Sequence, residues 1–472
     1  MIEIMIDLQG GAKAPLYEKI YEYIKNEIVG GKISKGEKLP STRLLAEQLA
    51  VSRSTVEMAY NQLLAEGYIV SEACRGHFVC DIRELYHLER KEVPMRKKVQ
   101  VKAEKKAYID FSPYAIDTKH FPYNVWRKLH RNVLLDDKEE MLLAGDGQGD
   151  MGLRSAIADY LHQARGVNCS PSQIIIGAGN EYLEILLVQL LGKEKRVLMD
   201  EPTYLQAYRT FSNMGYEVKT AGIGEKGMTI EQVQKAKPDI IYIMPSHQFP
   251  LGIVMPLKER LELLQWASEE EGRYLIEDDH DSEYRYRGKP IPSLQSIDHS
   301  ERVIYLGTFS KSIAPSLRIS YMVLPEHLTE VYQKRCSFYS TTVPKIEQEV
   351  LKAFIQEGHF GRHLNKMRAL YKTKHDFLVG ELKKRSWVAK IKGEHAGLHV
   401  LVQVRTKLSE EELCGLAEEA GVKVSGILEH YIHKDEMQKY PILLIGYGKL
   451  NEDEIKKGLC ILDEIIEKEA NK

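Results

Sequence analysis

The sequence of 472 residues lacks the features that mark several large classes of protein. Its longest apolar stretches, such as residues 185–191, fall far short of the about 20 residues that a membrane-spanning helix needs. The 66 Lys and Arg nearly cancel the 68 Asp and Glu, so bulk charge does not direct the whole chain to a polyanion. Residues 1–3 open an acidic N-terminus, unlike that of a secretory signal. We therefore predict a cytoplasmic protein with no membrane partner.

Cysteine pairs, repeats and biased tracts are missing as well. The six cysteines are scattered along the chain, with neither CxxC spacing nor the density of a disulfide scaffold. We therefore predict reduced thiols and no bound metal. What the chain does contain is apolar residues: 43% are hydrophobic, which is enough to bury sizeable cores. At about 150 residues per domain, the length allows about three domains.

Changes in composition along the chain indicate a multidomain protein. Residues 81–107 are rich in Lys and Arg and have little apolar periodicity, which is typical of a solvated linker, although a contact with a DNA backbone stays open. We predict one domain over 10–80 and a larger one over 108–472. Within the larger domain, the pattern changes near residue 360 to long helices with few strands, which indicates a small α+β subdomain over about 360–472.

The first domain has the pattern of a winged helix-turn-helix. Leu16, Ile20, Ile24 and Ile28 recur every four residues, as on one face of an amphipathic helix. A second helix is expected to begin after Ser41, and a third after a tight turn at residues 51–52. Two short β-like runs follow at 68–70 and 77–79. Three helices and a hairpin complete the expected motif.

Small hydroxyl and cationic residues cluster where the second and third helices begin. A recognition helix inserts its N-terminal end into the major groove, so Arg53 could bind a guanine edge or a phosphate, and the hydroxyls suit phosphate oxygens. The same hydroxyls could serve only as helix caps, in a winged helix that mediates protein contacts. The residues that we expect to contact DNA are Ser41, Arg43, Ser52, Arg53, Ser54, Thr55 and, at the wing, Arg75, Gly76 and His77.

The second domain alternates short apolar runs with helical patterns. This alternation predicts a mainly parallel sheet with helices on both faces. The expected strands are 173–177, 196–199, 240–244, 274–277, 303–306 and 319–323, and later 399–404 and 443–447; helices include 153–163, 181–191 and 257–270.

Four short elements near strand ends carry chemistry. Lys311, flanked by Ser310 and Ser312, could present its amine to an aldehyde, and Arg318 could hold a phosphate. Asp278 lies in an acidic run at the end of an apolar strand and could pair with a pyridinium nitrogen, although such a run could also be a metal site or a helix start. Residues 177–180 form a turn whose backbone N–H groups could cradle a phosphate. Tyr204 could stack on a ring.

Two resemblances join these observations. Residues 10–80, through the Pro-Ser-x-Arg-x-Leu-Ala and Val-Ser-Arg-x-Thr-Val patterns, resemble the GntR-type winged helix. The four elements, in this order, resemble a fold-type-I aminotransferase, which uses pyridoxal 5′-phosphate. With residues 245–252 and 396–399, nearly the whole chain resembles the MocR/GabR-type transcription regulators. The resemblance implies promoter DNA, a small-molecule effector and a homodimer formed through the aminotransferase-like domain.

The resemblance also implies roles for single residues. Lys311 would form the Schiff base with pyridoxal phosphate, Asp278 would pair with the ring nitrogen, Arg318 and Ser310 would bind the phosphate and Tyr204 would stack. Ala178, Gly179 and Asn180 would form the phosphate cup. Two positions depart from the aminotransferases: His280 stands where a Tyr donates to the cofactor phenolate, and Phe249 stands where an Asn binds the same oxygen.

The substrate end departs further. Leu444 stands at the place of the carboxylate-binding Arg of aminotransferases. GABA-responsive regulators use two other arginines: Gln206 stands at the first of these positions, and the second aligns near Glu429. We therefore expect an effector other than GABA, either an amine without a carboxylate or pyridoxal phosphate itself, unless Arg209 or Lys449 has taken over the contact. A regulator with little or no turnover is the main hypothesis. The alternatives are an active aminotransferase with an accessory DNA-binding domain, and a scaffold that only dimerises.

Overall fold

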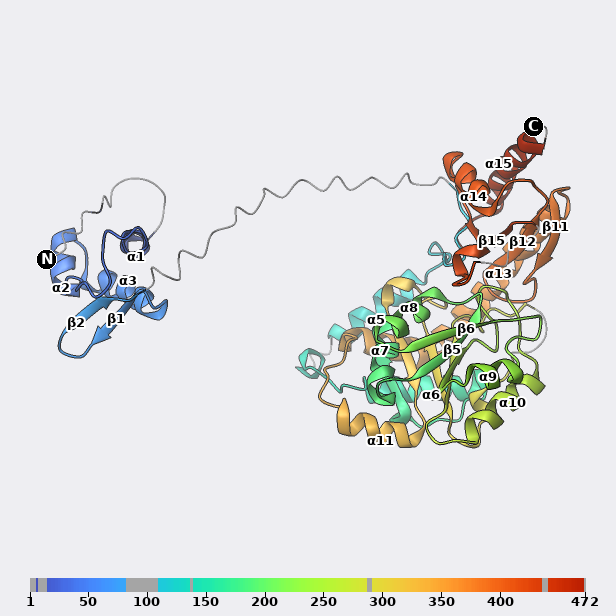
Figure 1. The fold of residues 1–472 in the computed structure, drawn as a ribbon, viewed down its shortest axis with the longest axis horizontal. Helices are drawn as coiled ribbons and strands as arrows, with labels where there is room; N and C mark the ends of the chain where they lie inside the picture. The colour runs from blue at the N-terminus through green and yellow to red at the C-terminus, as the bar shows by residue number, and fades with distance from the viewer. Residues whose placement is uncertain are drawn as a thin grey trace. The chain divides into compact units, whose positions relative to one another are not determined.

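The computed structural model describes residue 6 and residues 15–81, 109–135, 139–286, 291–434 and 440–470. Contacts divide the chain into two compact units, the N-terminal unit Met1–Glu104 and the C-terminal unit Lys105–Lys472 (Figure 1). The predicted linker 81–107 lies, apart from Asp81, outside the described residues. Within the described ranges, no helix has the length and apolar character required to cross a bilayer.

The N-terminal unit consists of three helices and a hairpin. Its core collects one face of each helix: Ile20, Ile24 and Ile28 are buried, whereas Leu16, at the start of the same stripe, is exposed. The hairpin strands pair antiparallel, from Ile69 opposite Val79 to Glu72 opposite Gly76. The elements are α1 (Leu16–Val29), α2 (Thr42–Leu49), α3 (Arg53–Ala65), β1 (Ile69–Glu72) and β2 (Gly76–Val79).

The C-terminal unit is built on a seven-stranded sheet in the order β4-β10-β9-β8-β7-β5-β6. Strands β6, β5, β7, β8 and β9 run parallel, and β10 runs antiparallel to both β9 and β4. The bounds are β4 (Ile174–Gly177), β5 (Arg196–Glu201), β6 (Glu217–Gly222), β7 (Ile240–Ile243), β8 (Tyr274–Asp279), β9 (Val303–Thr308) and β10 (Ser320–Val323).

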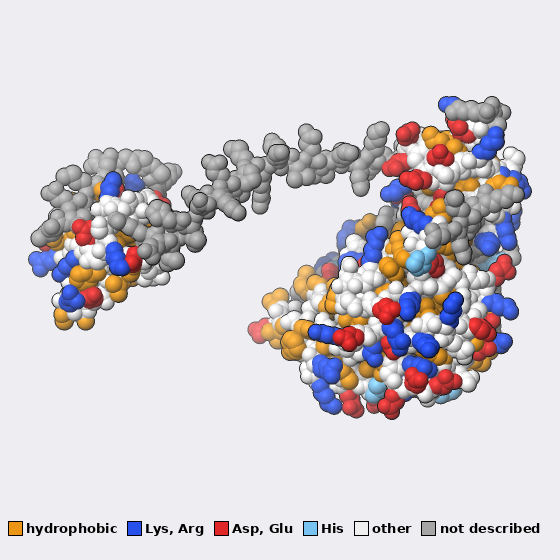
Figure 2. All heavy atoms as spheres, in the orientation of Figure 1, with side chains coloured by type: hydrophobic (Ala, Val, Ile, Leu, Met, Phe, Trp, Pro, Cys, Tyr) orange, Lys and Arg blue, Asp and Glu red, His pale blue; other side chains and the backbone are white. Residues whose placement is uncertain are grey.

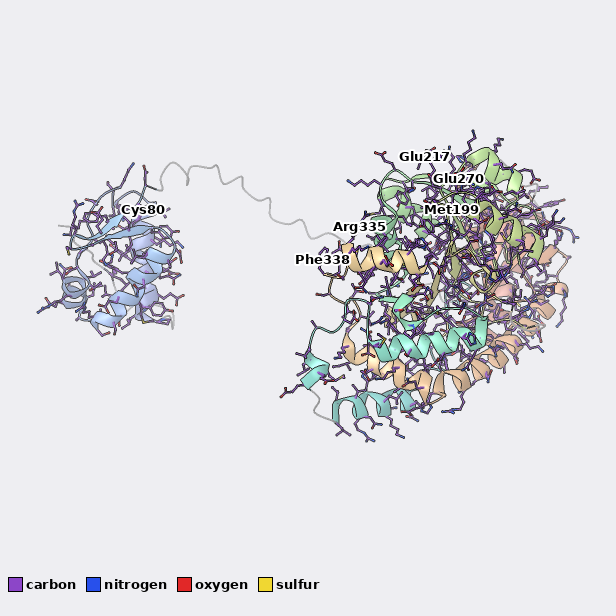
Figure 3. The ribbon with its side chains drawn as sticks, turned by 90° about the horizontal axis from the view of Figure 1, so that it is seen from below. Cys80, Met199, Glu217, Glu270, Arg335 and Phe338 are labelled. Carbon is purple, nitrogen blue, oxygen red and sulfur yellow. The ribbon has the colours of Figure 1, made fainter. Side chains whose placement is uncertain are left out.

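Alternate side chains of these strands enter cores on opposite faces of the sheet. Val197 and Met199 of β5 pack in a core with α7 and α8, whereas Leu198 packs with α10. Met199 is buried within the sheet, while Glu217 and Glu270 lie at the surface (Figure 3). The helices that accompany the large sheet are α5 (Tyr123–Leu135), α6 (Met151–Arg165), α7 (Asn180–Leu191), α8 (Leu205–Asn213), α9 (Ile230–Ala236), α10 (Leu257–Ser268), α11 (Glu326–Arg335) and α12 (Lys345–Gln356).

A smaller four-stranded sheet, in the order β11-β12-β15-β14, follows the long helix α13 (His359–Lys383). Two backbone amides, at Ile432 and His433, donate to Glu201 at the end of β5 and so join this part to the large sheet. The bounds are β11 (Val388–Lys392), β12 (His399–Val404), β14 (Ser425–Gly426), β15 (Ile442–Gly446), α14 (Glu410–Glu419) and α15 (Glu452–Ala470). A separate pair joins β3 (Ile109–Asp110) to β13 (Val422–Lys423) in parallel.

One strand of the large sheet was not predicted from the sequence. Strand β6 is an edge strand whose residues are all at least partly exposed, so it lacks the apolar run by which the other strands were found. The other six strands agree with the predicted ones to within two residues at each end. Because β5, β7, β8 and β9 are parallel, their carboxyl ends meet at one edge of the sheet, where sites of such folds form.

Candidate functional site

The starts of α2 and α3 present the hydroxyls predicted to contact DNA. Ser41 and Ser52 are the N-caps, because their side chains accept hydrogen bonds from the amides of Leu44 and Thr55, both at 3.2 Å. The Ser52 hydroxyl also lies 2.8 Å from that of Ser54 and 2.8 Å from that of Thr55. The capping role is therefore present, and the exposed Ser41, Ser52 and Ser54 still face solvent.

Each predicted DNA-contacting arginine is paired with a glutamate three or four residues away in the sequence. Arg53 Nε lies 2.7 Å from Glu57 Oε1 on α3, and its side chain is 67% exposed. Arg43 pairs with Glu47 in the same way, one helical turn along α2, at 3.2 Å. Exposed pairs of this kind are worth about 0–1 kcal/mol, so a phosphate or guanine can displace the glutamate at low cost.

The wing is the turn between β1 and β2. Arg75 is exposed, pairs with Glu72, and has its guanidinium carbon 5.4 Å from the Phe78 ring centroid. The His77 ring packs edge-on against Tyr60, with the ring centroids 5.1 Å apart, and burial lowers its pKa; its contact with DNA stays a prediction. The wing thus carries an exposed cation at Arg75, and Lys38 lies beside it, with its Nζ 6.0 Å from the Phe78 ring centroid.

In the C-terminal unit, the predicted cofactor residues gather at the carboxyl edge of the sheet. Asp278 is the last residue but one of β8, Lys311 follows β9 and Tyr204 follows β5. They line a cavity of about 170 Å³. Its lining consists of Tyr114, Gly179, Asn180, Glu181, Tyr204, Met244, Phe249, Asp278, His280, Thr308, Ser310, Lys311, Pro315, Arg318 and Ser320.

Lys311 presents a buried amine to this cavity. Its side chain is 12% exposed, and Nζ has no hydrogen-bond partner among the described residues. The nearest carboxylate oxygen in an ion pair is that of Asp281, at 3.9 Å, and Nζ lies 5.7 Å from the Phe249 ring centroid. Burial lowers the pKa of this amine, and the nearby carboxylates oppose that shift. A lysine with a lowered pKa supplies more of the neutral, nucleophilic amine.

Asp278 is a buried carboxyl fixed from two sides. The hydroxyl of Tyr242 on β7 donates to one oxygen, and Asn180 Nδ2 donates to the other at 3.3 Å. Burial raises its pKa, although His280, Tyr242 and Lys311 act in the opposite direction. A pyridinium nitrogen would supply the positive partner that this buried group lacks on the cavity side.

The end of the cavity predicted to hold a phosphate lies at the start of α7. Gly179 has φ 108° and is its N-cap, and a Cβ built there would come 2.1 Å from Arg318. Arg318 pairs with Glu181 at 2.6 Å. Ala178 departs from the prediction: its amide donates to Thr342 at 3.0 Å, and it does not line the cavity. Of the three residues predicted to form the phosphate cup, Gly179 and Asn180 line the cavity.

Hydroxyls complete this end of the cavity. The Ser310 amide donates to Thr308 Oγ1 at 3.1 Å, and the Ser320 hydroxyl donates to the same atom at 2.9 Å. Ser320 begins β10, which runs antiparallel to β9, so it reaches the edge at which β9 ends. Thr308, Ser310 and Ser320 therefore offer three hydroxyls beside Arg318.

Aromatic rings form the opposite wall. Phe249 lies 6.1 Å from Tyr204 with the rings nearly perpendicular, and 5.5 Å from Tyr114. Burial, together with the charge of Glu429, raises the pKa of Tyr114 to about 12, and a hydrogen bond with Gln206 opposes that shift. Gln206 and Glu429 thus both act on Tyr114, which lines the cavity. Leu444 is buried in the core and does not line the cavity.

A buried cluster of histidine and carboxylate stands behind Lys311. His247 Nδ1 lies 2.9 and 3.0 Å from the two Asp281 oxygens, and His280 Nε2 lies 3.4 Å from one of them. Ligand atoms of these three side chains lie within 4.8 Å of one another. The Lys311 amine faces the same carboxylate, and its positive charge would oppose a metal cation there.

Several residues that line the cavity or contact its lining were not predicted from the sequence. Tyr114 reaches the cavity from a segment far from the motifs, beside β3, and no local pattern indicates it. Tyr242 lies within an apolar strand and reads as core. Thr308 was within reach of prediction, because it stands in the small-hydroxyl run before Lys311.

Comparison with known proteins gives the same division of the chain. Residues 16–79 match the family of bacterial regulatory proteins of the gntR type, and residues 108–435 match aminotransferase class I and II. A relative named MocR, which is 32% identical to this chain over 96% of its length, decides the family: the chain belongs to the MocR-type transcription regulators. It is a DNA-binding regulator, in which a GntR winged helix is joined to an aminotransferase-like domain.

Full-length relatives and a solved structure support this assignment. The regulator is 39% identical over 447 residues to the "Uncharacterized HTH-type transcriptional regulator YdeL" of Bacillus subtilis, covering 94% of this chain and 95% of that protein. It is 32% identical to the "Probable rhizopine catabolism regulatory protein MocR" of Rhizobium meliloti, covering 96% and 94%. A multiple substrate aminotransferase from Thermococcus profundus has a TM-score of 0.68 and 25% identity, covering 78% of this chain and 93% of that one.

Proposed function

We propose that the regulator binds pyridoxal 5′-phosphate on Lys311 and uses the bound cofactor to sense a small molecule, while its winged helix binds promoter DNA in the cytoplasm. The observation that carries this proposal is a buried lysine amine that has no hydrogen-bond partner among the described residues, in a cavity with a fixed carboxyl on one side and a cation with hydroxyls on another. Class I and II aminotransferases, whose fold this unit shares, use this cofactor in general.

The residues present fit the group. Lys311 would hold the cofactor through its aldehyde, Asp278 would keep the proton on the pyridine nitrogen, and Arg318 with Ser310 would bind the phosphate. When bound, the cofactor supplies an aldehyde carbon that primary amines attack and a ring that withdraws electrons. Arg318 would have to turn from Glu181 toward the phosphate, and its half-exposed side chain is free to do so.

The chemical class of the effector is inferred from the charged residues that line the cavity. A carboxylate entering a partly buried site recovers its desolvation cost from a cation. Among the described lining residues, the cations are Lys311 and Arg318, and both are assigned to the cofactor. Of the two alternative cations, Arg209 is exposed and Lys449 lies 3.8 Å from Asp110. An amine without a carboxylate, or pyridoxal phosphate itself, therefore fits this cavity better than GABA does.

The same observations argue for little or no transaminase turnover. An aminotransferase must hold its amino acid in a fixed orientation while a proton moves, and a carboxylate-binding Arg provides that orientation. Leu444 is buried in the core instead. An active aminotransferase remains the second candidate because the fold is that of the enzymes.

A homodimer is part of the proposal. Large apolar side chains are exposed on the C-terminal unit, and Phe338, which follows α11, is 77% exposed (Figure 3). Exposed apolar side chains gather toward one end of this unit, whereas charges of both signs are interspersed over the rest of the face shown in Figure 2. Apolar patches of this kind mark protein interfaces. Leu134, Leu135, Leu142 and Leu143 of the same unit are exposed as well.

The test is reconstitution of the cofactor-free chain with pyridoxal phosphate. Wild type should gain the near-ultraviolet and visible absorbance of a lysine-bound cofactor, Lys311→Ala should lose it, and Lys366→Ala, a control lysine outside the cavity, should keep it. An unchanged band in Lys311→Ala would refute the assignment. Titrating the loaded protein with amines then identifies the effector class.

A further inference from the structure

Two sequence motifs that the proposed cofactor role leaves unused meet beside Lys311. Residues 245–252 contribute His247, and residues 396–399 contribute Gly397 and His399. A Cβ built on Gly397 would come 2.2 Å from the His247 ring, so only glycine leaves room for that ring. The His399 ring centroid lies 5.9 Å from that of His247. The segment leading into β12 of the small sheet thus fixes the position of His247.

His247 in turn fixes a carboxylate. Its Nδ1 lies 2.9 and 3.0 Å from the two oxygens of Asp281, and the side chains are 2% and 1% exposed. With Nδ1–H donating, the ring stays in one tautomer and turns the carboxylate toward Lys311, whose Nζ lies 3.9 Å away. A buried carboxylate requires such partners to remain charged.

Three carboxyl groups influence the Lys311 amine, and their surroundings shift their pKa values in different directions. Burial raises the pKa of Asp278, and it raises that of Glu283 to about 7. Burial would raise the pKa of Asp281 as well, but His247, His280 and Lys311 hold it well below the ordinary value. Asp281 is therefore the carboxyl of the three whose surroundings favour the charged form most strongly.

We propose that Asp281, oriented by His247, is the charge partner that holds a proton on the Lys311 nitrogen, both in the free amine and, resting on the proposed function, in its bond to the cofactor. Asp281 and His247 are positioning residues in this role. The pair supplies negative charge on the Lys311 side at a site where the sequence has His280 and Phe249 in place of the usual phenol and amide donors. It also joins the cofactor lysine to the small sheet through Gly397.

The sign of the expected effect follows from the charges. Burial lowers the pKa of Lys311, and Asp281 is the first of the carboxyls that oppose this shift. Removing the Asp281 charge should therefore lower the Lys311 pKa further. An opposite charge at this distance shifts a pKa by about 1–3 units. The other titratable groups that face Lys311, Asp281 or His247 are Asp278, His280, Glu283, Tyr284, Tyr286, His399 and Tyr447.

The test measures the reactivity of Lys311 in the full-length, cofactor-free chain. Competitive labelling with acetic anhydride over a range of pH, read out by peptide mass spectrometry, gives the pH at which the amine loses its proton. Asp281→Asn should lower this midpoint by about one pH unit or more, which is about tenfold more neutral amine below the midpoint. His247→Leu should shift it in the same direction, and His247→Gln, whose amide can still donate, should restore most of the wild-type value.

His375→Leu is the matched control. His375 is also a buried histidine whose Nδ1 lies 3.0 Å from a carboxylate, that of Asp376, and it does not contact Asp281. It should leave the Lys311 midpoint unchanged. Because this assay needs no cofactor, its outcome is separate from the reconstitution test of the proposed function.

A second readout uses the loaded protein. The pH at which the cofactor band changes should fall in Asp281→Asn and in His247→Leu, and should recover in His247→Gln. If Asp281→Asn does not fold, the two His247 variants decide the question alone. Labelling and absorbance profiles of His247→Leu that coincide with those of wild type and of His375→Leu would overturn the proposal.

Discussion

The two units use similar residue types in opposite surroundings. On the N-terminal unit, Arg53 and Glu57 form an ion pair with side chains 67% and 43% exposed. In the C-terminal unit, Asp281 is paired with His247 and lies 3.9 Å from Lys311, with side chains 1%, 2% and 12% exposed. An exposed pair can exchange partners at little cost, as DNA binding requires, whereas a buried pair fixes charge. The comparison predicts which substitutions are costly and where.

The largest effect is expected on the buried side, at Asp278. Asp278→Asn removes the charge that would hold a protonated ring nitrogen, while Tyr242 and Asn180 can still contact the amide. Hydrogen bonds to charged groups are worth about 1.5–3 kcal/mol, so cofactor affinity should fall about 10–150-fold. Equilibrium titration of the cofactor-free chain measures this. Asp239→Asn, whose carboxyl pairs with Arg196 outside the cavity, is the control.

On the exposed side, Arg53→Ala should weaken specific DNA binding by about 1–3 kcal/mol if the contact is bidentate to guanine. The loss should be concentrated on the operator and small on random DNA, because base contacts carry specificity. Mobility-shift titrations on both DNAs measure the difference. Equal losses of affinity for the two DNAs would show that Arg53 contacts a phosphate and not a base. An unchanged affinity would show that another surface recognises the DNA.

The effector site gives a third, smaller effect. Millimolar GABA, alanine and glutamate should leave the cofactor spectrum of the wild-type regulator unchanged. Gln206→Arg places a cation beside Tyr114 and should restore a response to GABA, about tenfold in affinity over wild type for a single charge-assisted contact. A saturable spectral change in the wild type with any of the three ligands would contradict the proposed effector class.

The smallest effect is a difference in pH dependence between the units. Burial raises the pKa of four carboxyls of the C-terminal unit to about 7, namely Asp200, Glu277, Glu283 and Glu410. Each stabilises the fold fully below its unfolded pKa, and this contribution is lost as pH rises through about 7. The lowered pKa values of His399, about 3, and His430, about 4, act only below pH 6.5.

The C-terminal unit should therefore lose stability between pH 6.5 and 8. The stability of the N-terminal unit should stay constant over this pH interval. The lowered pKa of His77 makes that stability rise with pH only below about 6.5. All three tryptophans lie in the C-terminal unit, so the midpoint of thermal unfolding by tryptophan fluorescence follows that unit alone. A fall on the order of 2 °C is expected, and a rise over this interval would contradict the assignment of the carboxyls.

The same comparison explains what the sequence could reveal. Residues that act from one contiguous segment, such as Arg53 after its capping serine or Lys311 after its strand, stand in recognisable local patterns. Tyr114 is brought to the cavity by tertiary contacts of distant segments, so no local pattern indicates it. Ala178 shows the converse: its turn was found, but the amide is taken by Thr342, from a loop 164 residues away. Strand β6 was missed because its side chains are polar and exposed.

The central claim is that one chain holds both a DNA-binding winged helix and a cofactor bound to a particular lysine. The most direct measurement is borohydride reduction of the regulator purified with pyridoxal phosphate, followed by peptide mass mapping. We predict a phosphopyridoxyl group on Lys311 at near-stoichiometric yield, and none on the lysines outside the cavity. A modification spread over surface lysines, or stoichiometric modification of a lysine other than Lys311, would contradict the account.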